Sequence, residues 1–183
     1  MRTYVISSKN QKTLFEGQFN SFNECLEHAV NNNVDLSHAD LKHKNLTNIN
    51  LDDARLTYAD LTGANLTGAN LSEARLLGAN FTNAALHSCC LAYSDLQHCL
   101  FNQTAFGATD ITGANISFSH FAGQSAYSLS FTDVGAMKNC LFTNTCGAAI
   151  ETSQSPIVIS GLKTTPIVLF NNQLSKDIRQ AIT

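Results

Sequence analysis

Large apolar residues recur at every fifth position through the middle of the chain. From Leu36 to Phe121, eighteen consecutive positions of this series hold only Leu, Ile or Phe. A second series lies two residues earlier and is small, with alanine at each of its seven positions from Ala54 to Ala84. A period of five matches neither the turn of an α-helix nor the alternation of a β-strand. The pattern therefore predicts an internal repeat.

Residues 1–33 precede the repeat and predict two strands and a helix. Tyr4–Ile6 and Thr13–Phe15 are short apolar runs separated by polar residues, as in a β-hairpin. Ser21, followed three residues later by Glu24, is a capping box that marks the start of a helix. We expect this unit to cap the repeat, because the open end of a repeat stack exposes backbone and apolar groups.

The repeat region itself is predicted over residues 34–146. The five-residue pattern falters at Gln124–Ala126, where we expect a bulge or a corner loop, and Phe131 restores it. Weaker matches to the series of large residues then follow at Ala136, Leu141 and Cys146.

Residues 147–183 leave the repeat and predict a C-terminal hairpin with a tail. Ile157–Ile159 and Ile167–Phe170 have the composition of strands, and a proline precedes each of them. The tail is predicted as a short amphipathic helix, because its apolar residues are spaced by four: Leu174, Ile178 and Ile182.

Three consecutive units, Ala59–Gly63, Ala64–Gly68 and Ala69–Glu73, have the sequences ADLTG, ANLTG and ANLSE. They resemble the A(D/N)LXX unit of the pentapeptide repeat family, in its bacterial or phage-encoded type. The resemblance implies an all-β solenoid, a right-handed quadrilateral β-helix with one unit per side and four units per coil. Residues 34–146 would then make five to six coils.

Four units per coil place residues that are twenty apart in vertical columns inside the solenoid. One expected column consists of Leu41, Leu61, Phe81, Phe101, Phe121 and Leu141, and another contains Leu66, Leu86 and Phe106. Coils about 4.8 Å apart allow aromatic rings to stack. Lys44 occupies a position of the small series, so we expect an open corner there or a bulge that turns Lys44 outward.

Composition narrows the classes of function. Charged residues make up 14% of the chain, and the formal net charge of −3 leaves no basic excess for direct binding of nucleic acid. No apolar run approaches the roughly 20 residues that span a bilayer, and the N-terminus lacks the apolar core of a signal peptide. The six cysteines have no regular spacing and fit reduced thiols. The sequence therefore predicts a cytoplasmic protein.

We expect no enzymatic activity, no metal site and no cofactor. The histidines fall on different columns or several coils apart, and no set of four ligands can be assembled from histidine and cysteine. The sequence contains no phosphate-binding glycine loop and no nucleophile elbow. A smooth four-sided rod also offers no deep cleft for a substrate.

The outward positions predict one acidic side and one column of rings. The acidic side carries Asp52, Asp53, Glu73, Asp110 and Asp133, and it has no Lys or Arg. The predicted ring column on another side holds His38, Tyr58, Gly78, His98, Phe118 and Lys138. An acidic face and exposed rings on a rigid rod favour a protein-binding module whose partner is unknown. The alternative is that the acids only keep the rod soluble and that the rings only pack along the stack.

Two further hypotheses remain open from the sequence. Some pentapeptide repeat proteins look like DNA and bind DNA gyrase or topoisomerase IV, and the resemblance makes a DNA-mimic-like modulator of these enzymes one alternative. The repeat region, however, holds nine acids against five bases, which is sparse charge for a DNA mimic. The other alternative is a structural or self-assembling scaffold, with a homodimer formed through the C-terminal region.

Overall fold

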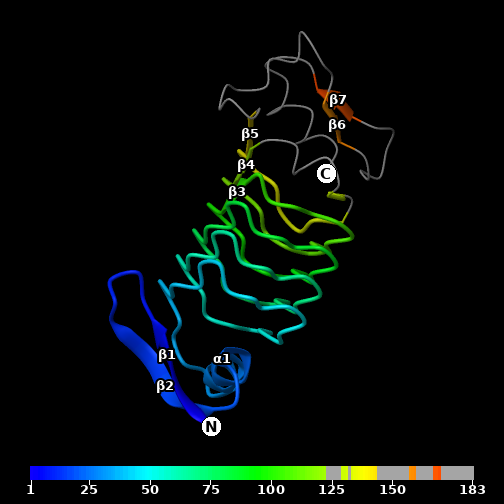
Figure 1. The fold of residues 1–183 in the computed structure, drawn as a ribbon. Coiled ribbons are helices and arrows are strands. Elements are labelled where there is room, and N and C mark those ends of the chain that lie inside the picture. The colour runs from blue at the N-terminus through cyan, green and yellow to red at the C-terminus, as the bar shows by residue number, and fades with distance from the viewer. Residues whose placement is uncertain (123–128, 132, 144–156, 160–166, 170–183) are drawn as a thin grey trace.

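The chain folds into a rod of stacked turns with a small α/β unit at its N-terminal end (Figure 1). The structure is a computed structural model, and it describes residues 1–122, 129–131, 133–143, 157–159 and 167–169. The N-terminal unit consists of β1 (Arg2–Ser7), β2 (Thr13–Phe19) and α1 (Phe22–Asn31). β1 and β2 form an antiparallel hairpin that α1 contacts along both strands. Cys25, Leu26 and Ala29 form the buried face of α1.

The start of α1 follows the predicted capping box with one difference. The Ser21 hydroxyl accepts a hydrogen bond from the Glu24 amide at 3.1 Å, as expected for an N-cap residue. The Glu24 carboxylate, however, accepts from the amide of Asn20 at 2.9 Å, one residue earlier than a regular capping box. The first interaction satisfies one of the backbone donors that a helix start leaves open, and the second satisfies the amide of the residue that precedes the N-cap.

The rod is a β-solenoid in which each turn contains twenty residues. Parallel bridges join residues twenty apart along the rod, for example Asp40 to Asp60 and Asp60 to Asn80. Near the far end these bridges widen into a parallel sheet of β3 (Leu100–Asn102), β4 (His120–Ala122) and β5 (Leu141–Thr143). One turn therefore consists of four five-residue units, and the ladder between turns satisfies backbone groups along the rod.

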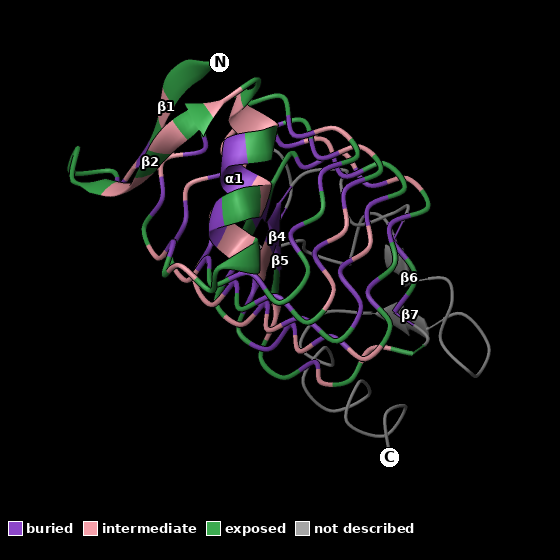
Figure 2. Cartoon of the chain, turned by 90° about the horizontal axis from the view of Figure 1, so that it is seen from below, coloured by how far each residue is buried: buried purple, intermediate pink, exposed green. Residues whose placement is uncertain are grey.

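The side chains of each five-residue unit explain why the chain turns a corner there. The central large residue and the small residue two positions earlier are buried, whereas most other positions are partly or fully exposed (Figure 2). The residue two positions after the centre has a left-handed backbone, as at Asn48 (φ 56°) and Gly68 (φ 69°). Asn, Asp and Gly tolerate this conformation better than other residues. An Asn or Asp just before the centre holds the corner, as where Asn65 Oδ1 accepts from the Thr67 amide at 3.1 Å.

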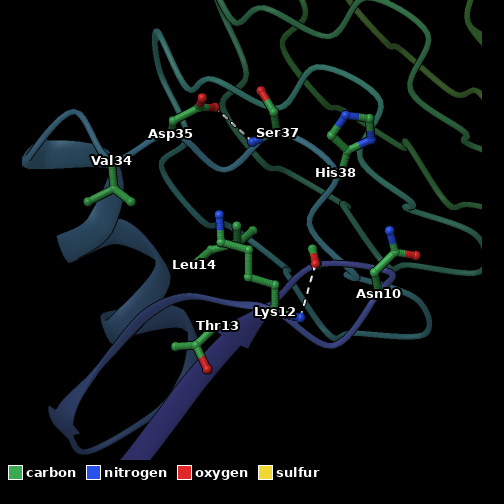
Figure 3. A pocket seen from close by; sticks show the side chains of 9 residues that line it. Asn10, Lys12, Thr13, Leu14, Val34, Asp35, Ser37 and His38 are labelled. Carbon is green, nitrogen blue, oxygen red and sulfur yellow. Dashed lines mark hydrogen bonds between the residues drawn. The ribbon is translucent and has the colours of Figure 1, made fainter.

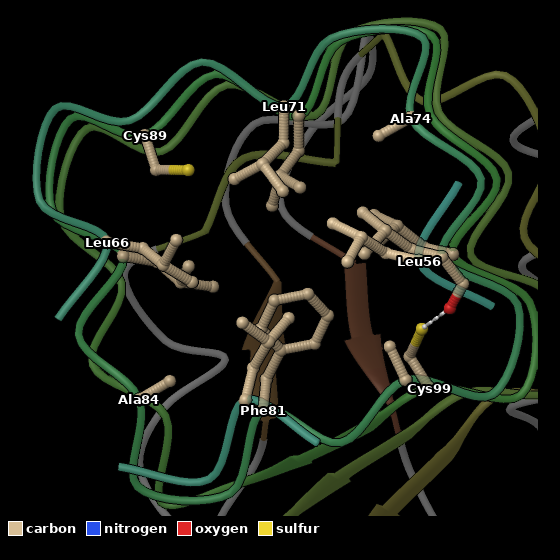
Figure 4. Packing of buried hydrophobic residues seen from close by; sticks show 14 of the residues in the cluster. Leu56, Leu66, Leu71, Ala74, Phe81, Ala84, Cys89 and Cys99 are labelled. Carbon is tan, nitrogen blue, oxygen red and sulfur yellow. Dashed lines mark hydrogen bonds between the residues drawn. The ribbon is translucent and has the colours of Figure 1, made fainter. Parts of the chain in front are cut away.

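Side chains from all four sides meet in the middle of the rod. Figure 4 shows Leu56, Leu66, Leu71 and Phe81 pointing toward the centre, with the smaller Ala74, Ala84, Cys89 and Cys99 nearer the corners. Phe81, Phe101 and Phe121 stack in successive turns, with ring centroids 5.1 and 4.9 Å apart. The residues assigned to the core from sequence are buried here: Leu41, Leu61, Leu66, Phe81, Leu86, Phe101, Phe106 and Phe121.

Lys44 lies at an open corner of the first turn and not on a bulge. Its backbone keeps the regular pattern, since its amide donates to Leu41 O and its carbonyl accepts from the Asn65 amide. The Lys44 side chain is exposed, and its ammonium group lies 4.7 Å from the centroid of the Phe22 ring in α1. A lysine is tolerated because this corner ends the stack and faces an aromatic ring instead of another turn.

The predicted register is wrong beyond Phe131. Gly135 and Ala136 both donate to the carbonyl of Ala114, so two residues oppose one and form a β-bulge. From there on the turns are offset by twenty-one residues, because Phe121 pairs with Phe142 and their rings stack at 5.2 Å. Leu141 is 48% exposed and is not a core residue.

The same offset corrects two further assignments in the last turn. The five-residue series predicts Ala136 as the buried central residue of its unit. In the structure Met137 is buried instead, and Ala136 is partly exposed. Asn139 (φ 53°) takes the corner that the sequence assigned to Lys138 in the ring column. The irregularity predicted at Gln124–Ala126 lies outside the described residues, as does Cys146.

Two short strands follow the solenoid. β6 (Ile157–Ile159) and β7 (Ile167–Leu169) form an antiparallel pair with Val158 opposite Val168. They lie where the sequence predicts strands. Phe170 and the helix predicted for the tail lie outside the described residues.

Candidate functional surfaces

The acidic side of the rod is formed by residues on successive turns around one row of core residues. Asp52, Asp53, Glu73, Asp110 and Asp133 are all exposed. Asp53 and Glu73 occupy the same left-handed corner in neighbouring turns, with φ values of 53° and 55°. The Ser72 hydroxyl donates to Asp52 Oδ1 at 2.6 Å, and Asp110 Oδ1 accepts from the Thr112 amide at 2.9 Å. The corner backbone and these hydrogen bonds therefore position four of the acids, and all five side chains are exposed.

Tyr93 belongs to this side and was missed in the sequence. It occupies the corner one turn beyond Glu73, and at 67% exposure it is the most exposed aromatic residue among those that the structure describes. Its ring lies over Gly113 in the next turn, where a Cβ atom would come within 2.4 Å of it. The five-residue register places Tyr93 in this corner column, but tyrosine is uncharged and the acidic side was defined from the sequence by its charges.

The ring column is a set of stacked pairs. His38 stacks on Tyr58 with centroids 5.3 Å apart, and His98 stacks on Phe118 at 4.9 Å. The Tyr58 ring lies over Gly78, where a Cβ atom would come within 2.4 Å. Tyr58 and Phe118 remain nearly half exposed. The column combines lateral packing with exposed aromatic edges, so neither use excludes the other.

Other exposed groups are divided between the two ends of the rod. Near the N-terminal end Lys42 lies 3.7 Å from a carboxylate oxygen of Asp40 and 3.9 Å from one of Asp60. Near the other end Leu100 and Leu141 flank His120 in the parallel sheet and are exposed. His120 Nε2 lies 2.8 Å from the Thr143 hydroxyl. Exposed apolar side chains therefore increase toward the C-terminal end of the solenoid.

Among the described cysteines, Cys89 and Cys99 are buried inside the rod and Cys140 is partly buried. Burial raises the pKa of Cys89 to about 12 and that of Cys140 to about 11, and it raises the pKa of Cys99 as well. The Cys99 thiol donates to the carbonyl of Leu76 at 3.1 Å (Figure 4). Buried thiols with raised pKa values are poor nucleophiles. Within the described part of the chain, no three His, Cys, Asp or Glu side chains are grouped to hold a metal ion.

A cleft of about 650 Å³ lies between the hairpin and the first turn (Figure 3). We call it the hairpin cleft, and its lining consists of Ser8, Asn10, Lys12, Thr13, Leu14, Val34, Asp35, Ser37 and His38. The Ser37 amide donates to Asp35 Oδ1 at 2.9 Å, and hydrogen bonds from Ser37 lower the pKa of the Asp35 carboxyl, with smaller contributions from the charges of Arg55 and His38. The sequence predicts no deep cleft on the rod itself, and this cleft forms where the hairpin meets the first turn.

No described helix combines the length and the apolar character that crossing a membrane requires.

The repeat region matches a known family model. Residues 32–68 and 59–103 match the model described as pentapeptide repeats, in eight copies. No curated protein matches the chain.

Several solved structures are similar to part of the chain. One is a pentapeptide repeat protein from the thylakoid lumen of Arabidopsis thaliana, with 28% identity over 44% of this chain and 63% of that one, at a TM-score of 0.28. Another is the pentapeptide repeat protein Rfr23 from the cyanobacterium Cyanothece 51142, with 28% identity over 45% and 57% and a TM-score of 0.30. A third is QnrB1, a plasmid-mediated fluoroquinolone resistance protein, with 14% identity over 58% and 66% and a TM-score of 0.33. The chain thus spans 57–66% of the length of these proteins.

Proposed function

The chain carries the repeats of the pentapeptide repeat family, and on this premise we propose that it is a non-enzymatic module that binds a protein partner through the acidic side. The observation that supports this most directly is the combination of five exposed acids with the exposed Tyr93 ring on one side of a rigid rod. That side carries no Lys or Arg. Tyrosine is among the residues that dominate binding energy at protein interfaces.

The chemistry of this side indicates a partner with a basic surface. Asp53, Glu73 and Tyr93 occupy successive turns, which are spaced about 4.8 Å apart along the axis. A row of negative charge attracts a positive surface and speeds association, and salt weakens this attraction. The Tyr93 ring supplies a contact that salt affects little.

Capture of partners from a bacterial lysate tests this proposal. Immobilised wild type should retain at least one protein that is lost from the charge-reversed D52K/D53K/E73K variant and reduced by Tyr93→Ala. Tyr58→Ala is the matched control, because it removes an exposed tyrosine from another side. Retention should fall as salt is raised. A set of captured proteins that is the same for wild type and the charge-reversed variant would refute the proposal.

The topoisomerase hypothesis is a special case with its own test. A supercoiling assay with DNA gyrase, repeated with topoisomerase IV in a decatenation assay, would detect it at micromolar protein. Inhibition or quinolone protection that disappears in D52K/D53K/E73K would identify these enzymes as the partner, and the absence of any effect would remove them. The scaffold hypothesis is tested by light scattering, because a chain that stays monomeric with and without residues 156–183 does not form the expected dimer.

We also propose a finer architecture for the solenoid. It is right-handed, has five to six coils over residues 34–146, and is capped by residues 1–33, with residues 147–183 as a separate C-terminal hairpin and tail. The cap is supported by hydrogen bonds to the first turn. Two backbone donors of the first turn bond to residues of the cap, whereas their equivalents in later turns bond to the turn before them. The amide of Asp40 donates to Ser7 O at 2.8 Å, and that of Asn50 donates to the Glu27 carboxylate at 2.9 Å.

A further inference from the structure

We propose that the hairpin cleft binds a short extended peptide that carries one acidic and one basic side chain. This site is independent of the acidic side, because it lies between the hairpin and the first turn and shares no residue with that side. Its volume of about 650 Å³ falls within the range of pockets that bind small ligands.

The walls of the cleft are already fixed in position. The hairpin loop is tied to the first turn by the Lys9 amide, which donates to His38 O at 3.0 Å, and by a bridge between Ser8 and Ala39. Opposite, the amide of Val34 donates to Ala29 O at the end of α1, and the amide of Leu36 donates to Arg55 O, both at 3.0 Å. A site whose walls are held by backbone hydrogen bonds loses little conformational entropy when a ligand binds.

The two walls carry opposite charges. Lys12 belongs to the hairpin wall and Asp35 to the wall of the first turn (Figure 3). Among the residues that the structure describes, neither side chain forms an ion pair, since both salt bridges found there involve Lys42. The hydrogen bonds from Ser37 keep the Asp35 carboxylate ionised and oriented. A ligand that fills the cleft can therefore offer a carboxylate to Lys12 and a cationic group to Asp35.

The remaining lining favours a peptide over a single ion. Leu14 and Val34 add apolar surface to the lining, next to the two charged residues (Figure 3). Leu14 is also the extra residue of a β-bulge in the hairpin. Ile6 pairs with Phe15 and Ser7 pairs with Thr13, so no residue of β1 pairs with Leu14. Such a bulge leaves backbone groups outside the ladder, where an added extended segment can pair with them. An extended peptide satisfies the charged, apolar and backbone features together.

Titration of the ¹⁵N-labelled full chain with blocked peptides tests this assignment. The probe is acetyl-Glu-Val-Arg-amide, and the matched neutral peptide is acetyl-Gln-Val-Gln-amide. We expect saturable shifts at the amides of residues 12–14 and 34–38, with weaker binding of the neutral peptide. Lys12→Gln and Asp35→Asn should each weaken binding of the charged peptide by about two- to fivefold, the effect of one exposed ion pair. Lys9→Gln removes a lysine outside the lining and should leave binding unchanged.

Several outcomes would overturn the assignment. One is the absence of saturable shifts at these amides with the charged peptide at millimolar concentration. Another is equal affinity for the charged and the neutral peptide. Free glutamate or arginine that reproduces the shifts at the same concentration would show that the cleft recognises a free amino acid and not a peptide. Because both variants alter exposed side chains, their amide spectra should otherwise match the wild type and report folding directly.

Discussion

The two halves of the rod use the same five-residue unit but are held together in different ways. From Leu36 to Leu76 every central residue is leucine, and most corners are closed from outside by an Asn or Asp that accepts from the backbone two residues later. Beyond Phe81 this bond persists at Asp95, Asp110 and Asn115. Four of the equivalent positions hold residues that cannot make it, namely Ala85, Cys90, Leu100 and Ala105. The second half therefore lacks many of the side-chain bonds that stabilise its corners.

The second half is stabilised from inside instead. Phe101 stacks on Phe81 and Phe121 and also contacts the Phe106 ring at 5.5 Å. Buried hydroxyls replace several alanines of the small series and reach the carbonyls of the previous turn, as where Thr104 donates to Phe81 O at 2.7 Å. Thr109 and Ser119 make equivalent bonds to Leu86 O and Leu96 O. The same backbone shape can thus be maintained by outer polar groups or by inner rings and donors.

The largest expected effect is the loss of a ring from the aromatic stack. Phe101→Ala should lower the free energy of unfolding by about 3–5 kcal/mol, because it leaves a cavity and removes three ring contacts. Leu66→Ala in the first half should cost less, at about 2–4 kcal/mol. Urea unfolding of both variants measures the difference.

Leu66→Asp is the control for the register of the first half. It should destabilise the chain more than Leu66→Ala, because it buries a charge without a partner. A cost for Phe101→Ala no greater than that for Leu66→Ala would mean that the stacked rings add nothing beyond their buried area. A thermal melt unchanged by Leu66→Asp would contradict the inward position of Leu66.

The β-bulge is the next most sensitive point of the second half. Gly135 packs so closely on the previous turn that a Cβ atom would lie 2.3 Å from Gly113 O, and backbone cannot move aside as a side chain can. Gly135→Ala should therefore cost about 1–3 kcal/mol, the range seen for overpacking. Amide hydrogen exchange should show the loss at Ile116 and Phe118, which donate to Ala136 O and Lys138 O.

Gly107→Ala is the matched control for this change. A Cβ atom at Gly107 would meet the exposed ring of His87, which can rotate away, so little loss of stability is expected. Equal effects of the two substitutions would contradict a specific role for the close approach at Gly135.

The period, the inward residues and the N-terminal elements could be predicted from the sequence because each depends on local pattern. The offset in the last turn could not, because Leu141 and Phe142 are both large and apolar and only the paired amides of Gly135 and Ala136 decide between them. The family model ends at residue 103, whereas the outer Asn and Asp residues already become infrequent from Ala85. The hairpin cleft was also beyond prediction, because it depends on where the hairpin docks and not on any motif.

The stability of the second half depends on pH because Cys89 occupies a buried position of the small series. Alanine, which fills most of these positions in the first half, does not titrate. Burial raises the pKa of Cys89 to about 12, from an ordinary value of 9.0. The Cys89 thiol therefore holds its proton more tightly in the folded state than in the unfolded state. The stabilisation of the folded state that results is complete below pH 9 and is lost as pH rises toward about 12. Each pH unit in that window lowers the free energy of unfolding by about 1.4 kcal/mol. Urea unfolding of wild type should thus lose stability from about pH 9 to pH 10.5 faster than that of Cys89→Ala, and parallel curves would contradict the burial of this thiol.

The smallest expected effects come from exchanging the outer residues of two adjoining units. Asn80 Oδ1 accepts from the amide and the hydroxyl of Thr82, at 3.0 and 2.6 Å, so Asn80→Ala should cost about 0.5–1 kcal/mol. Ala85 occupies the equivalent position one unit later, and Ala85→Asn would place an acceptor near the amide of His87, with a gain of a few tenths of a kcal/mol. Thermal melts of the two single variants and the double variant measure both effects. If Ala85→Asn is neutral while Asn80→Ala is costly, the corner at Ala85 is stabilised by the core alone, and the difference between these two corners is one of mechanism and not merely of a missing bond.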